Sequence, residues 1–137
     1  MTFNEHALEM SIMKLFESEG YEHVTGNDIH REKTDVLLID DLKNYLYDKY
    51  ADDRITPTEV ESIILTLRSA SGTVYEANKT VFKMICDGFI FNREDRSQKD
   101  LYIQLIDFDM PDNNVFKIVN QVEIQGRDQL RIPDGIV

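Results

Sequence analysis

Three shortages in the sequence each exclude a class of protein: it has one cysteine, few basic residues and no long apolar run. Because Cys86 has no second cysteine to pair with, no internal disulfide can form, and the three histidines show no metal-site spacing with it. A lone cysteine in an apolar stretch is typical of a small core residue, so we expect Cys86 to be buried and the protein to be cytoplasmic. No apolar stretch reaches the roughly 18 to 20 residues of a membrane span, and the N-terminus lacks the pattern of a signal peptide, so we expect no membrane association.

The charge balance is strongly acidic. The 137 residues contain 15 Lys and Arg against 26 Asp and Glu, which gives a formal net charge of −11. Such a charge argues against a module that holds nucleic acid by phosphate contacts on its own, and it favours a protein partner. At 42% hydrophobic and 30% charged residues, the chain is expected to fold as one domain at most, with a modest core.

Residues 2–88 follow a helical period and predict four helices. The first is expected from the capping spacing of residues 2–5 to Gly20, with Tyr21 as the apolar contact of a Schellman end. The others are expected over about 34–50, from 56 onward, and over 75–87. Their expected buried faces are Leu8, Ile12, Leu15 and Phe16 in the first helix, Leu38, Leu42, Tyr45 and Leu46 in the second, and Val60, Ile63, Ile64 and Leu67 in the third.

After Gly88 the apolar period changes from helical to alternating. Strands are expected over 101–108 and 115–124, joined by a turn over 109–114, and a last strand begins near Arg131. The sequence therefore predicts an α+β fold, with a helical part over 1–88 and the first strands of a sheet over 99–137. Because the apolar run up to Val137 stops inside a rising strand, we expect a fragment of a longer protein; a short edge strand at a true C-terminus is the alternative.

Several familiar chemistries find no support in the sequence. The acidic turn over 107–113 lacks the glycine of a calcium loop at its sixth position, and Ile118 stands where the bidentate glutamate belongs. The glycines are isolated, so no phosphate-binding loop and no nucleotide site are visible. No nucleophile turn marks a Ser-His-Asp or Cys-His arrangement.

The dipeptide Pro133-Asp134 at a strand start is the first half of a nuclease signature. In that chemistry an Asp on one strand and an acid on the next hold Mg²⁺, which polarises the phosphoryl oxygen and activates water. A Lys two residues beyond the second acid stabilises the developing charge. The segment Asp41-Leu42-Lys43 precedes Asp134 and lies in an expected helix, so we interpret it as chance.

Two acidic residues of the first expected helix are further candidates. Glu5 and Glu9 are one turn apart and flank Phe16 at the edge of the apolar stripe. A carboxylate at the edge of a buried face can supply a metal ligand. The alternative is that both are half-solvated residues that repel each other weakly.

Four stretches, in chain order, carry a family resemblance. They are Leu8-Glu9 with Gly20-Tyr21-Glu22; the segment 35–38; the most specific run, 105–108 with 114–121, which ends in Asn120-Gln121; and the segment 131–137 around Pro133-Asp134. Together they resemble the N-terminal part of the R (restriction) subunit of type I restriction-modification enzymes, over essentially the whole chain.

The resemblance implies a PD-(D/E)xK nuclease domain, here a helical layer packed on an incomplete restriction-endonuclease-like β-sheet. It implies that the full subunit carries an ATP-driven DNA translocase, works with methyltransferase and specificity subunits, and cuts duplex DNA with Mg²⁺. By position, Asp134 matches the first metal-binding catalytic acid. Glu9 matches the acidic position of the first helix near that metal, with Glu5 as a second choice.

The sequence departs from the family pattern in one respect. The second acid and its Lys should follow Asp134, but only 135–137 do, so we expect this fragment to be inactive and to bind no ATP itself. The competing hypothesis is a non-catalytic docking module, in which the helical half binds the methyltransferase and specificity subunits and the strands serve as scaffold.

Overall fold

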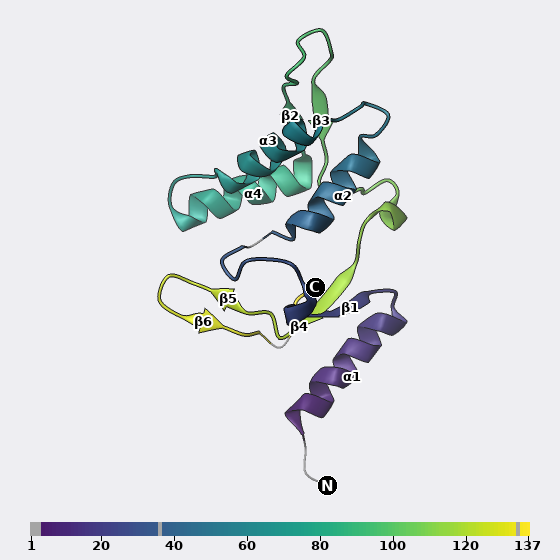
Figure 1. Cartoon of the computed structure of the whole chain (residues 1–137). Helices are drawn as coiled ribbons and strands as arrows, with labels where there is room; N and C mark the ends of the chain where they lie inside the picture. The colour runs from purple at the N-terminus through teal and green to yellow at the C-terminus, as the bar shows by residue number, and fades with distance from the viewer. Residues whose placement is uncertain (1–3, 36, 134) are drawn as a thin grey trace. The chain divides into compact units, whose positions relative to one another are not determined.

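The structure is a computed structural model that describes residues 4–35, 37–133 and 135–137 (Figure 1). The chain forms two compact units, Met1–Leu38 with Val115–Val137, and Ile39–Asn114. The second unit therefore lies, in sequence, between the two segments of the first. Each unit combines helices with short strands, so the predicted α+β class is confirmed. No helix in the described ranges is long and apolar enough to cross a membrane.

The first unit begins with helix α1 (Glu5–Ser18), which has clear signals at both ends. The Asn4 side chain caps the start by accepting from the backbone N–H of His6; the predicted capping residue Thr2 lies outside the described residues. At the other end, Gly20 adopts φ +95°, and the backbone N–H of Tyr21 donates to the carbonyl of Phe16 at 3.0 Å. The two aromatic rings meet edge to face at 5.2 Å, so the predicted Schellman end is confirmed.

The buried face of α1 differs from the predicted one. Met13 is buried, with Glu9, Met10 and Phe16 half-buried beside it, whereas Leu8, Ile12 and Leu15 are exposed. The prediction for these three residues is therefore wrong. The buried side of α1 is centred on Met13, about a third of a turn around the helix from Leu8, Ile12 and Leu15, and α1 contacts both strands of the parallel pair described next.

The strands of the first unit centre on a parallel pair. β1 (Glu22–Thr25) pairs with β4 (Lys117–Asn120), with His23 opposite Ile118, and α1 contacts both strands. Since β1 falls within residues 1–88, the prediction that this part contains only helices is wrong there. Four residues give no recognisable alternation, and the partner strand is far away in sequence.

The C-terminal segment adds to the same small sheet. Val119 and Ile136 exchange two backbone hydrogen bonds of 2.8 Å, so the segment after residue 134 lies beside β4. A hairpin of β5 (Ile124–Gln125) and β6 (Leu130–Arg131) precedes it. The strand predicted to begin near Arg131 is present only in part, since β6 ends at Arg131 and Ile136 forms an isolated bridge. The strand predicted over 115–124 is divided in two, because Gln121 has a left-handed backbone with φ +56°.

The second unit packs helices around a short hairpin. It contains α2 (Ile39–Lys49), α3 (Pro57–Arg68), α4 (Val74–Asp87), and the antiparallel strands β2 (Phe89–Phe91) and β3 (Leu101–Ile103). Its core is formed by Leu46, Tyr50, Val60, Ile63, Ile64, Leu101 and Ile103. The predicted buried stripe of α3 is confirmed, whereas α2 starts five residues later than predicted and the strand predicted over 101–108 ends at Ile103.

Helix α4 is predicted correctly in sequence but buries none of its residues. Its N-terminus has a capping box in which Thr73 and Glu76 bond each other's backbone N–H. Cys86 on this helix is exposed, so its predicted burial is wrong. The apolar character of the segment reflects a helix face that the described part of the unit leaves open.

A buried ion pair ties the hairpin of the second unit to α3. Glu59 and Arg93 are 2% and 7% exposed, and the guanidinium donates from Nε and Nη2 to the two carboxylate oxygens at 3.0 Å each. Arg93 also donates to the carbonyl of Asp53 at 2.7 Å, while Glu59 completes the capping box of Thr56. The arginine, more than the capping amide, holds the pKa of Glu59 below its usual value.

Removing the cation of this pair tests its contribution. Arg93→Met leaves the Glu59 carboxylate buried without its counter-ion, so we expect the free energy of unfolding to fall by about 3–5 kcal/mol. Urea unfolding followed by circular dichroism measures the loss. Arg96→Met, which removes an exposed arginine from the same loop, is the control and should change stability by less than about 0.5 kcal/mol. Equal losses in the two variants would contradict the structural role of the pair.

Candidate functional site

The carboxylate of Glu9 lies against the end of β4 in the first unit. Its side chain is 9% exposed, and Oε1 accepts from the side-chain amides of Asn120 at 3.0 Å and of Gln121 at 3.1 Å. These amide donors, Asn120 first, hold the pKa of Glu9 below its usual value, so the group is ionised at neutral pH. Oε2 lies 3.9 Å from Nδ1 of the exposed His6.

The turn after β4 explains why two consecutive residues reach one carboxylate. Neighbouring side chains of a strand normally point to opposite faces. The left-handed backbone of Gln121 ends the strand and brings its amide to the same oxygen as that of Asn120. Gly26 makes room for this turn, because a Cβ there would lie only 2.3 Å from the Gln121 carbonyl oxygen.

A histidine completes the arrangement from β1. Nε2 of His23 lies 2.8 Å from Oδ1 of Asn120, 97 positions later in the sequence. Its other ring nitrogen lies 4.0 Å from a carboxylate oxygen of Glu17. We call Glu9, His23, Asn120 and Gln121 the Glu9 site. Three elements therefore converge on one carboxylate: α1, β1 and the end of β4.

The structure describes two of the three candidate site residues from the sequence. Glu9 lies in the site just described, while Glu5 is exposed. Asp134 lies outside the described residues. The residues that follow it are described: a Cβ on Gly135 would lie 2.9 Å from Met13 of α1, and Ile136 pairs with Val119 of β4.

The sequence alone marks no role for His23, Asn120 or Gln121. The available signal was the run ending in Asn120-Gln121, which carried the family resemblance most specifically. Asn120 is buried, and a buried amide needs hydrogen-bond partners that the sequence alone does not name.

The Glu9 carboxylate is suited to supply one ligand to a divalent cation. Both side-chain amides donate their hydrogen bonds to Oε1, and both are neutral. The negative charge of Glu9 is therefore stabilised without being cancelled. Carboxylate oxygens are the protein ligands that Mg²⁺ prefers. Within 4–35, 37–133 and 135–137, no group of three or more His, Cys, Asp or Glu side chains is arranged to hold a metal, so Glu9 needs further ligands.

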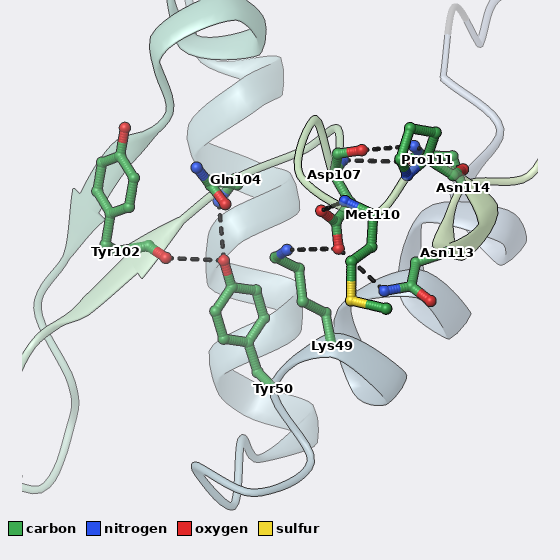
Figure 2. A network of polar contacts seen from close by, with 9 residues as sticks. All are labelled: Lys49, Tyr50, Tyr102, Gln104, Asp107, Met110, Pro111, Asn113 and Asn114. Atoms are coloured by element: carbon green, nitrogen blue, oxygen red, sulfur yellow. Dashed lines mark hydrogen bonds and ion pairs between the residues drawn. The ribbon is translucent and has the colours of Figure 1, made fainter.

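The acidic turn in the second unit is built on a carboxylate with a structural role (Figure 2). Asp107 is buried and accepts from the backbone N–H of Met110 at 2.9 Å, from the Asn113 amide at 3.1 Å and from the Lys49 ammonium at 3.1 Å. These donors, Met110 first, lower the pKa of Asp107 to about 2. The carboxylate therefore organises the turn around the short 3₁₀ helix Pro111–Asn113.

The lowered pKa of Asp107 makes a prediction about acid stability. Because its pKa is about 2 in the folded chain, below the ordinary aspartate value of 3.8, its ionised form stabilises the fold fully above pH 4. This contribution is lost as the pH falls from about 4 to 2. We expect Asp107→Asn to be less stable than the parent at pH 7, with a gap that narrows below pH 4. Chemical unfolding at a series of pH values measures this, and Asp109→Asn, an exposed neighbour, should keep the parent's profile.

Comparison with known proteins gives the family. Residues 2–137 match the family described as the type I restriction enzyme R protein N terminus, and the chain belongs to it. The endonuclease subunit of the type I restriction enzyme HindI from Haemophilus influenzae is 28% identical over an alignment 144 residues long, gaps included, and the aligned region takes in 97% of this chain and 14% of that subunit. The chain thus spans about 14% of the length of this relative. No solved structure matches the chain.

Proposed function

We propose that this chain is the N-terminal part of a type I restriction endonuclease subunit and contributes to Mg²⁺-dependent cleavage of duplex DNA. The observation that carries the proposal is the Glu9 carboxylate. It is ionised, held by two neutral amides, and anchored to the strand beside which the residues after Asp134 pair. A family of restriction enzyme subunits supplies the reaction class.

In this proposal Glu9 and Asp134 are ligands of the metal. Bound Mg²⁺ would polarise a phosphoryl oxygen and lower the pKa of an attacking water. The protein's part is to keep the Glu9 carboxylate charged and oriented, which Asn120 and Gln121 do through Oε1. The second acid and the Lys of the reaction come from outside these 137 residues, so we expect the 137-residue chain alone to be inactive.

The remaining activities belong, in the same proposal, to other parts of the complete protein and its complex. ATP binding and translocation along DNA fall to the portion of the subunit that the HindI relative has beyond the 14% matched here. The methyltransferase and specificity subunits select the DNA site. With a net charge of −11, this part does not hold DNA by itself.

Two substitutions in the complete, assembled subunit test the proposed roles. Asp134→Asn and Glu9→Gln each remove a negative charge from the metal site, so we expect DNA cleavage to fall at least about 100-fold while ATP hydrolysis stays near the parent rate. Gel assays of plasmid cleavage and a coupled ATPase assay measure the two activities. Asp128→Asn and Glu94→Gln make the same changes at exposed positions and should cleave normally. Normal cleavage by Glu9→Gln would remove Glu9 from the mechanism.

A docking role for the second unit is the second candidate, and α4 favours it. Val74, Tyr75 and Phe82 on this helix are 78%, 75% and 68% exposed, a large apolar exposure for one helix. We propose that this face binds the methyltransferase or specificity subunits.

Assembly with those subunits tests the docking role directly. Phe82→Ser should weaken assembly about ten-fold, because it removes a large apolar side chain from the proposed contact. Sedimentation of the mixed subunits measures the affinity. Leu15→Ser removes a similarly exposed apolar side chain from the first unit and is the control. Unchanged assembly by Phe82→Ser would leave α4 without this role.

A further inference from the structure

The donor and the acceptor of each hydrogen bond between His23, Asn120 and Glu9 can be assigned. An ionised carboxylate only accepts, so Asn120 must present its Nδ2 to Glu9. Its Oδ1 therefore faces His23, and an amide oxygen also only accepts. Nε2 of His23 must then carry the proton and donate. The tautomer of His23, the orientation of the Asn120 amide and the orientation of the Glu9 carboxylate are therefore linked by one series of hydrogen bonds.

The bond to His23 also favours one orientation of the Asn120 amide. Asn120 and Gln121 both donate to Oε1. If the Asn120 amide turned over, its oxygen would face the carboxylate and repel it. While Nε2 of His23 carries the proton, its bond to Oδ1 opposes that turn, since the turned amide would present an N–H to the N–H of the ring.

We propose that His23 is a positioning residue, which acts through Asn120 to hold the Glu9 carboxylate by Oε1 and so orients it as the ligand that would bind the metal. This inference rests on the proposed function, in which Glu9 is a ligand. Hydrogen-bond partners of metal ligands commonly change metal affinity about 10- to 100-fold when they are removed.

The geometry separates this role from direct ligation by the histidine. Nε2 of His23 is engaged with Asn120, and Nδ1 lies near Glu17 on the far side of the ring from that bond. A ring that donates through Nε2 cannot bind a metal through the same atom. His23 therefore influences the metal only through the amide and the carboxylate.

Two near-isosteric variants of His23 test the inference in the complete subunit. The side-chain amide of Gln reaches the place of Nε2, whereas that of Asn reaches only the place of Nδ1. His23→Gln can therefore donate to Asn120 and His23→Asn cannot, although both remove the imidazole. The probe is Mn²⁺ alone, titrated in the absence of DNA and ATP and followed by electron paramagnetic resonance, with plasmid cleavage as a second measurement.

We expect His23→Gln to keep Mn²⁺ affinity within about 2-fold of the parent and His23→Asn to lose about 10-fold or more, with cleavage following the same order. Thermal melting checks that both variants fold like the parent. If His23→Asn does not, His23→Ser, whose side chain is also too short to donate to Asn120, replaces it and should also lose about 10-fold.

Other outcomes overturn the inference in distinguishable ways. Parent-like affinity in His23→Asn would show that the histidine positions nothing. Equal losses in both folded variants would show that the imidazole itself is required and overturn a role exerted through the amide. Glu9→Gln is measured beside them: if it binds Mn²⁺ and cleaves like the parent, the proposed function of Glu9 fails. If Glu9→Gln loses both while His23→Asn loses neither, only the positioning role fails.

Discussion

The parallel pairing of β1 with β4 is the constraint on which the first unit depends. It aligns His23 with Ile118 and Thr25 with Asn120, across a separation of most of the chain. Because parallel neighbours need a long connection, the whole second unit can be accommodated between the two strands in sequence. Helix α1 packs on this pair, and Glu9 finds its donors only because β4 ends where it does.

Three carboxylates with little solvent exposure have different roles in this acidic protein. Glu59 faces the cation of Arg93, so its charge is cancelled and it serves packing. Asp107 faces Lys49 and the N–H groups of its own turn, so it fixes a loop. Glu9 differs because its donors are neutral amides, which orient a charge and leave it available to a cation.

Local signals made the second unit more predictable than the first. The capping box at Thr56 and the stripe of α3 act within one helix, and the structure has both. By contrast, β1 has four residues and a distant partner, so no local pattern marks it. The predicted buried face of α1 is wrong because apolar side chains occur on more than one side of this helix. Only contact with the rest of the unit determines which side is buried. Glu9 followed from its helix position and the family resemblance, whereas the donors Asn120 and Gln121 needed a left-handed turn at a non-glycine residue.

The interrupted order of the first unit has a consequence for synthesis on the ribosome. The residues of α1 and β1 emerge first, yet β4 follows only after the continuous second unit, with His23 and Asn120 97 positions apart. At about 5–20 residues per second, that interval lasts roughly 5–20 s, long enough for the second unit to fold by itself. The carboxylate of Glu9 therefore lacks its amide donors during this interval. It is removed from solvent only after β4, which carries Asn120, has been synthesised and has paired with β1.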